Sequence, residues 1–228
     1  MAPIYFDFTG DPVSIEGAEV LDCTSLEETR RYCSPEAERQ LAAMISGRYS
    51  GVHFLGSGDY HYISKIFCDS IAEPFDLLLF DHHPDMQKPV FEGVLSCGGW
   101  VRDMLEQNRF LRNVTIVGMA GELMPETEGF PGRVTVFPEG ACVHSVPGAL
   151  PIYISVDKDA FCPCFARTNW DQGSLTLPEF GKVLHLLSGD RRVLGADICG
   201  SMPISEGGTR MDAALNSETD RILLEHFC

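Results

Sequence analysis

The sequence predicts an α/β fold: a three-layer, doubly wound sheet whose strands are mostly parallel. Six short, nearly continuous apolar runs are bounded by turn residues, and helical segments lie between them. Continuous apolar runs are typical of strands buried on both faces, and alternation of strand with helix is typical of a parallel sheet. A chain of 228 residues with 44% hydrophobic content is long enough for one sizeable core, so we expect a single domain over residues 1–228.

The predicted strands cover residues 3–8, 51–56, 76–80, 113–118, 151–156 and 192–197. The predicted helices cover residues 34–48, 98–110, 177–189 and about 210–226. Helix 34–48 opens with Ser34 as its N-cap and Pro35 at the first helical position, a common pairing at helix starts. Helix 177–189 has a proline near its start and a glycine at its end.

Composition restricts the partners. The formal net charge is −16, from 33 acidic and 17 basic residues, so we expect no nucleic-acid partner, because phosphate binding needs clustered Lys and Arg. No run reaches the roughly 18 apolar residues of a membrane span, and no signal peptide is visible, so we expect no membrane and a cytoplasmic location. The nine cysteines are then expected to be reduced thiols, and Cys162-Pro-Cys164 lacks the second pair that a structural zinc site needs.

Polar residues follow four predicted strands at the point where each ends. In chain order they are residues 57–61 (SGDYH), residues 81–85 (DHHPD), residues 157–159 (DKD) and Asp197. In open parallel sheets, ligands bind outside the carboxyl ends of the strands. These residues are therefore the candidates for chemistry.

Their types and spacing predict a metal site. If the chain leaves its strand extended, Asp81, His83 and Asp85 point to one side, and Asp157 and Asp159 repeat the spacing from a second strand. Four isolated carboxylates would repel one another and raise their own pKa values. Two divalent cations would balance them, and an oxygen-rich set with imidazole favours manganese.

The alternative is an ordinary acidic loop. A DxHxD string occurs by chance, and His61 alone, after a Gly-Asp turn, would more often be a turn residue than a ligand. The second motif, and a histidine after a third strand, favour metal binding.

These motifs resemble those of the arginase/agmatinase (ureohydrolase) family, whose fold is distantly shared with histone deacetylases. That family carries Gly-Gly-Asp-His, DxHxD and SxDxD motifs in this order, and the matching segments here are residues 57–61, 81–85 and 155–159. Residues 173–180 (GSLTLPEF) and 194–203 (LGADICGSMP) extend the likeness, which covers about residues 50–227.

The resemblance implies a dinuclear manganese hydrolase. One ion would be bound by His61, Asp81, Asp85 and Asp157, and the other by Asp81, His83, Asp157 and Asp159, with Asp81 and Asp157 bridging. A hydroxide between the ions would attack a guanidine or amidine carbon and release urea and an amine. The expected substrate is a small molecule or a peptide, with peptidyl-arginine among the candidates, and an oligomer is possible.

Several positions depart from the family pattern. Tyr60 is inserted before His61, and Cys162 stands where the family has an aspartate. Gly200 stands where the family has the glutamate that binds the guanidinium, and the family's proton-shuttle histidine aligns near Cys97. The metal-binding residues are therefore present, whereas the substrate-reading groups are missing or moved.

Two acidic residues are candidates to replace them. Glu122 lies near the family's acidic substrate contact, and Asp171 lies in the loop that approaches the metals in the family. The alternative for each is a solvated or turn residue. With Asp85 and Asp157, they complete the expected catalytic set.

Two other functions compete with ureohydrolysis. The glycine at position 200 favours a deacetylase-like amide hydrolase. The missing histidine near Cys97 favours a metal-binding domain that has lost catalysis.

Overall fold

The computed structural model describes residues 2–11, 15–146 and 148–227. Its main sheet has eight strands in the order β2-β1-β4-β10-β9-β5-β7-β8, and every neighbouring pair is parallel. The strands are β1 (Ile4–Asp7), β2 (Glu19–Asp22), β4 (Val52–Phe54), β5 (Phe75–Phe80), β7 (Leu111–Met119), β8 (Val134–Pro138), β9 (Ile152–Asp157) and β10 (Val193–Cys199). The short strands β3 (Tyr32–Cys33) and β6 (Leu95–Ser96) pair antiparallel outside this sheet.

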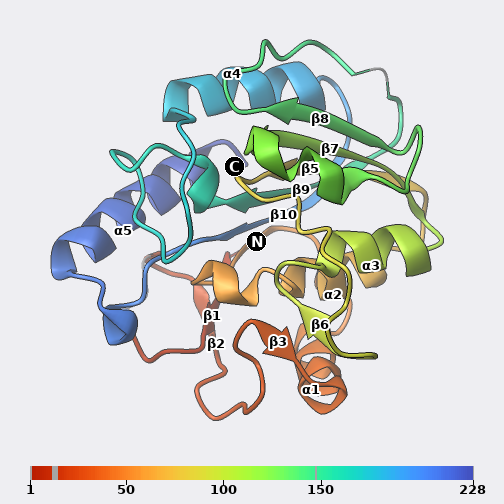
Figure 1. Ribbon diagram of the computed structural model, residues 1–228. Coiled ribbons are helices and arrows are strands. Elements are labelled where there is room, and N and C mark those ends of the chain that lie inside the picture. The colour runs from red at the N-terminus through yellow and green to blue at the C-terminus, as the bar shows by residue number, and fades with distance from the viewer. Residues whose placement is uncertain (1, 12–14, 147, 228) are drawn as a thin grey trace.

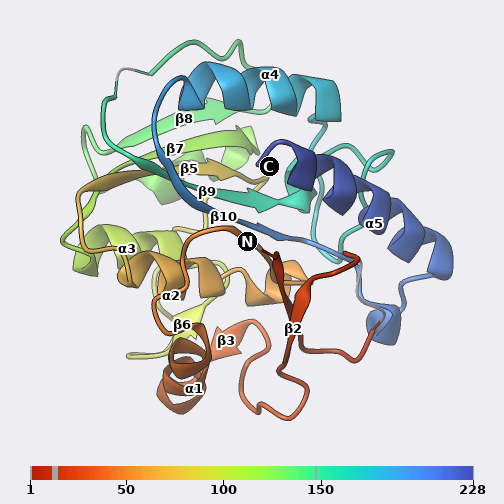
Figure 2. The ribbon, with the colours of Figure 1, turned by 180° about the vertical axis from the view of Figure 1, so that it is seen from behind.

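Helices cover both faces of the sheet. The helices α1 (Pro35–Ile45), α2 (Ile63–Asp69) and α3 (Trp100–Gln107) lie on one side, and α4 (Leu177–Ser188) and α5 (Arg210–Glu225) lie on the other (Figure 1). The view from behind shows the same two layers around the sheet (Figure 2). A separate buried apolar cluster fills each interface, with Leu41, Phe67 and Trp100 on the first side and Phe180 and Leu223 on the second. The predicted three-layer α/β fold is confirmed.

The element predictions hold with small shifts of the ends. All six predicted strands and all four predicted helices are present, and the Ser34 hydroxyl caps α1 by accepting a hydrogen bond from the Ala37 amide at 3.2 Å. The edge strands β2 and β8 and helix α2 were missed. Helix α2 is buried at six of its seven residues, so it lacks the one-sided apolar pattern that reveals a helix. No helix in the described ranges is long and apolar enough to cross a membrane.

Lys158 follows β9 directly, at the start of the short helical turn Lys158–Ala160. Its ammonium group is buried on the side of α5, where it donates hydrogen bonds to Asp220 Oδ1 at 2.6 Å and Ser201 Oγ at 2.7 Å. A buried charge of this kind needs a partner. Asp220 supplies that partner, as an ion pair buried on both sides.

His53 is a buried histidine that no solvent reaches. It lies in β4, donates from Nδ1 to the Ala196 carbonyl at 3.1 Å, and stacks on Phe67 with ring centroids 4.0 Å apart. Burial lowers the pKa of His53 from 6.5 to about 4.

We predict that His53 makes the protein acid-sensitive. Between pH 6.5 and about 4 the unfolded chain binds a proton at this imidazole while the folded protein does not, so the contribution of His53 to the free energy of unfolding falls as the pH falls. The loss amounts to about 3 kcal/mol over this window. His53→Asn should flatten this part of the curve in urea unfolding experiments. His185→Asn, at an exposed position of α4, should leave it unchanged; equal curves for wild type and His53→Asn would contradict the prediction.

Candidate metal centre

The candidate residues meet where four neighbouring strands end. The strands β4, β10, β9 and β5 lie side by side, and their register places Cys199 beside Asp157 and Phe80 beside Val156. The chain segments that leave these strands therefore converge at one edge of the sheet.

The first group of ligand atoms contains His61, Asp81 and Asp85. The His61 Nδ1 atom lies 2.9 Å from Asp85 Oδ2, 3.3 Å from Asp81 Oδ2 and 3.6 Å from Asp157 Oδ2. All four side chains are buried. One imidazole nitrogen thus faces three carboxylates.

The second group contains Asp81, His83 and Asp159. The His83 Nδ1 atom lies 2.8 Å from Asp159 Oδ2 and 3.6 Å from Asp81 Oδ1. Asp81 therefore belongs to both groups, as expected of a bridging ligand.

Asp157 belongs to a third group, with His61 and Cys199. The Cys199 thiol lies 3.0 Å from Asp157 Oδ2, while Asp157 Oδ1 accepts a hydrogen bond from the Asp159 amide at 2.8 Å. The sequence singled out Asp157, but it did not point to the cysteine.

Segment 81–85 reaches this arrangement through a turn. The His83 amide donates to Asp81 Oδ1 at 2.6 Å, and Asp85 has a left-handed backbone with φ of 49°. Few residues other than glycine adopt this conformation, and it concentrates at functional sites. The assumption of an extended segment was wrong, although its outcome holds, because the left-handed Asp85 turns its carboxylate back toward His61.

The inserted Tyr60 leaves His61 in reach of the carboxylates. Residues Gly58–Tyr60 form a short helical turn capped by the Ser57 hydroxyl, and the Tyr60 ring stacks on Phe8 with centroids 3.9 Å apart. This turn accommodates the inserted residue without moving His61 away from the carboxylates, and the Tyr60 side chain packs in the core.

The orientation of His61 is fixed by a hydrogen-bonded chain. His61 Nε2 lies 2.8 Å from the Ser155 hydroxyl, which donates to Asp197 Oδ1 at 2.6 Å. Asp197, at the end of β10, is thus linked to His61 through the Ser155 hydroxyl. With Nε2 bound to Ser155, the Nδ1 atom faces the carboxylates, which is how an outer partner sets the ligating nitrogen of a histidine.

The centre carries more negative charge than its surroundings compensate. Burial raises the pKa values of Asp85 and Asp157, and burial with the charge of Asp81 raises that of Asp159 to about 6. Burial alone would lower the pKa of His83, but its contacts with Asp159 and Asp81 raise it to about 12. Within the described residues, no lysine or arginine pairs with these carboxylates.

One carboxylate oxygen of the centre accepts no hydrogen bond within the described residues. Asp81 Oδ2 is fully buried and accepts no hydrogen bond from the described part of the chain. A buried carboxylate oxygen without a donor is costly. A divalent cation would satisfy this oxygen and offset the excess charge, so the residues present fit the expected metal pair.

A cavity of about 230 Å³ opens above these groups. All six predicted ligands line it, and its walls include Arg31, Cys97, Leu123, Glu126 and Trp170. The candidate ligands thus lie within reach of a small molecule.

Glu122 and Asp171 lie outside this cavity. Both are exposed, and neither contributes to its lining. Glu126, four residues after Glu122 in the turn Gly121–Thr127, lines it instead. Arg31 also lines it, with its guanidinium 5.0 Å from the centre of the Trp170 ring and its Nε donating to Asp59 at 3.3 Å. The sequence carries no periodic signal for Glu126 or Arg31, because both come from irregular segments.

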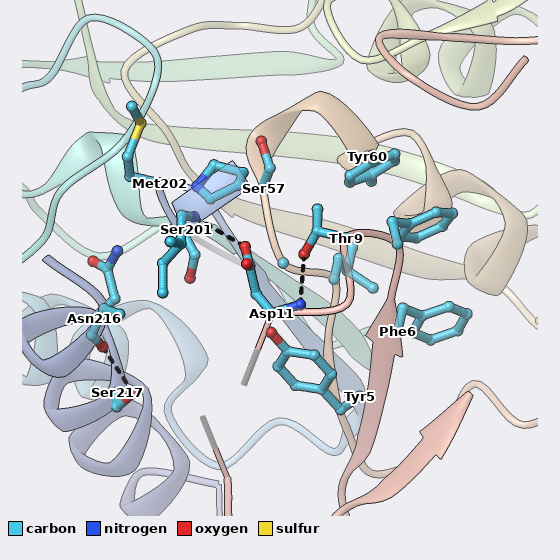
Figure 3. Close-up of a pocket in the computed structure, with 16 residues that line it drawn as sticks. Tyr5, Phe6, Thr9, Asp11, Ser57, Tyr60, Ser201, Met202, Asn216 and Ser217 are labelled. Atoms are coloured by element: carbon cyan, nitrogen blue, oxygen red, sulfur yellow. Dashed lines mark hydrogen bonds between the residues drawn. The ribbon is translucent and has the colours of Figure 1, made fainter. Parts of the chain in front are cut away.

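A smaller cavity of about 50 Å³ lies near the ends of β1, β4 and β10 (Figure 3). Side chains of Thr9, Asp11, Tyr60, Ser201 and Asn216 surround it, and none of the six predicted ligands lines it. The larger cavity is therefore the candidate active site.

Gly200 explains one departure from the family pattern. Its φ is 90°, and a Cβ atom there would lie 2.2 Å from Asp157 Oδ1 and 2.7 Å from the Lys158 amide nitrogen. A glutamate at this position would displace Asp157. The glycine is thus a requirement of this backbone, which passes too close to the ligand for a side chain.

The comparisons with known proteins agree with this fold. No family model matches the chain. It is 28% identical over 186 residues to an uncharacterised protein of Thermotoga maritima, covering 80% of this chain and 71% of the relative.

Solved structures resemble it more completely. Proclavaminate amidino hydrolase from Streptomyces clavuligerus is 20% identical with a TM-score of 0.64, covering 84% of this chain and 70% of that one. Formimidoylglutamase from Bacillus subtilis is 12% identical with a TM-score of 0.66, covering 99% and 85%. A Mn²⁺-bound triple mutant of a T. brucei arginase-like protein is 17% identical with a TM-score of 0.63, covering 98% and 78%. The chain therefore has the arginase (ureohydrolase) fold, which confirms at the level of the fold the resemblance seen in its sequence.

We predict that Gly200→Ala disrupts the centre. The added methyl group would collide with Asp157, so the free energy of unfolding should fall by about 3 kcal/mol or more, and metal binding should weaken. Gly207→Ala is the matched control: its φ is 100°, and nothing lies within 4 Å of the added atom, so it should cost only about 1 kcal/mol. Urea unfolding and metal titration measure both variants. Similar losses in the two would show that backbone strain alone, and not the contact with Asp157, matters at position 200.

Proposed function

We propose that this protein is a metal-dependent hydrolase that cleaves a C–N bond of an amidine or guanidine group. The observation that carries the proposal is the convergence of His61, Asp81, His83, Asp85, Asp157 and Asp159 at the floor of one cavity. The arginase fold supports the same class, because one structural neighbour is by its name an amidino hydrolase.

These six residues are the proposed ligands of two divalent cations. Two such ions would supply a nucleophilic water of lowered pKa and neutralise charge in the transition state. Manganese is the expected metal for the group of Asp81, His83 and Asp159, whose donors are oxygen and nitrogen only.

The protein's own contribution is orientation and charge. Ser155 holds His61 by Nε2, and the Trp100 indole donates to Asp85 Oδ2 at 2.6 Å. Both contacts come from buried groups, so the ligand atoms are held in place before a metal or substrate arrives.

The cavity wall matches a substrate with charges of both signs. Glu126 lines the cavity, and Arg102 donates to its backbone carbonyl and not to its carboxylate, so the carboxylate can meet an amidinium or guanidinium. The Arg31 guanidinium, held against Trp170, suits a carboxylate at the substrate's other end. An amino-acid-like guanidine or amidine fits this pair, and peptidyl-arginine stays a candidate.

The decisive experiment is a turnover assay on protein loaded with Mn²⁺. We expect release of urea, an amide or ammonia from at least one member of a panel: arginine, agmatine, guanidino and amidino carboxylic acids, formimino amino acids and peptidyl-arginine. Asp81→Asn should abolish turnover and reduce bound metal, because Asp81 is shared by both groups. Asp171→Asn, at the exposed position outside the cavity, should retain both. Metal binding without turnover of any panel member would contradict the proposed activity.

We also predict that Glu126, and not Glu122, is the acidic residue that binds the substrate. Glu126→Gln should lower kcat/KM at least about tenfold, because it removes a charge that faces the cavity. Glu122→Gln, on the same turn but exposed, should stay within about twofold of wild type. Steady-state kinetics on the best panel substrate measures both. The reverse order would restore Glu122 to the role that the sequence suggested.

An amide hydrolase is the second candidate. The observation that favours it is Gly200, since the backbone there excludes the glutamate with which the family binds guanidinium. Turnover of acetyl-lysine or an acetylated polyamine, with none of the guanidine panel, would select this function. A lapsed metal-binding domain would bind metal and turn over neither group of substrates.

A further inference from the structure

Cys199 is a thiol placed inside the metal centre. It is the last residue of β10, and its side chain is fully buried. Its sulfur lies 3.0 Å from Asp157 Oδ2, and ligand atoms of Cys199, Asp157 and His61 all lie within 4.8 Å of one another. It is the one described cysteine that shares such a group with histidine and carboxylate ligands.

The local backbone explains why the sulfur reaches the centre. Side chains alternate along β10, so Cys199 and Asp197 point to the same face of the sheet, where Asp197 holds Ser155 and through it His61. Gly200 then lets the chain pass close to Asp157, where a side chain would collide. At the end of β10, Cys199 therefore contacts one carboxylate oxygen of Asp157, and the backbone of Gly200 passes close to the other.

We propose that Cys199 is a thiolate ligand, and that the His61, Asp157 and Cys199 part of the centre binds Zn²⁺ in preference to Mn²⁺. This inference deepens the proposed metal-dependent hydrolase and rests on the metal binding that it requires. A second observation points to a cation here: the buried Asp81 Oδ2 lies 3.3 Å from the same His61 Nδ1 and accepts no hydrogen bond from the described residues.

The donor set decides the metal. Thiolate sulfur favours zinc, whereas manganese prefers oxygen ligands and binds more weakly in the general affinity series. Coordination replaces the S–H bond of Cys199 with a sulfur–metal bond and releases the proton to solvent. The second group, Asp81, His83 and Asp159, has no sulfur. The two parts of the centre therefore differ in metal preference.

Cobalt provides a direct probe of the sulfur. Full-length protein is stripped with a chelator and titrated with Co²⁺, followed in the near-ultraviolet, where sulfur-to-cobalt charge transfer absorbs. We expect this band in the wild type and in Cys97→Ser, and its loss in Cys199→Ser. Cys97 is the matched control, because it is buried in the wall of the same cavity but belongs to no ligand group.

Competition between metals tests the preference. Cys199→Ser should weaken Zn²⁺ binding by roughly 100-fold and Mn²⁺ binding by less than about threefold. X-ray absorption on the Zn²⁺-loaded wild type needs no variant, and it should show a zinc–sulfur distance of about 2.3 Å.

The outcomes separate this inference from the proposed function. Metal binding to the wild type without the cobalt band, or with zinc bound by nitrogen and oxygen alone, overturns the thiolate and leaves the hydrolase proposal intact. Equal loss of Zn²⁺ and Mn²⁺ in Cys199→Ser also overturns it. If the wild type binds none of the three metals, both proposals fail.

Discussion

Excess negative charge, gathered at the ends of two adjacent strands, is the constraint around which this centre is organised. The carboxylates of Asp81, Asp85, Asp157 and Asp159 are buried together, and among the described residues the basic side chains that contact them are His61 and His83. Such a cluster is unfavourable in a protein interior unless cations or protons neutralise it. The rest of the structure holds it in place: the parallel register brings β5 and β9 together, and the apolar layers keep water away from both.

The charges near the cluster are separated by the sheet. Lys158 lies between two of the aspartates in sequence, but its ammonium group pairs with Asp220 on α5. On the other side of the same strand end, Asp157 and Asp159 are left without a basic partner from this residue. The short helical turn Lys158–Ala160 that follows β9 thus directs the Lys158 ammonium group toward α5, away from the carboxylates, and leaves those carboxylates available for a metal.

The buried strands, and the polar residues that directly follow them, are the parts of the structure that could be predicted from the sequence. Six of the eight strands of the main sheet were visible as apolar runs, and with them the places where polar residues had to converge. The edge strand β2 was not visible, because most of its side chains are exposed and its burial shows no alternation. The convergence of these carboxylates and histidines could be predicted because a strand fixes where its next residues lie. Cys199 follows the same rule, two residues after Asp197 on one face of β10, and the alternation could have revealed it.

The residues of the cavity wall opposite the carboxylate cluster could not be predicted from the sequence in this way. Glu126 and Arg31 come from irregular segments, whose paths depend on tertiary packing and have no period in the sequence. Alignment with the family pointed to Glu122, and the helical turn Gly121–Thr127 exposes that residue while bringing Glu126 to the cavity. At position 200, comparison with the family pattern shows only that a glycine stands in place of the family's glutamate. The structure adds a steric reason, since Asp157 occupies the space that any side chain there would need. Under the proposed function, a substrate cation would therefore be bound by a residue from an irregular segment and not from the end of β10. The sheet would then set the chemistry of the centre, and the irregular segments its specificity.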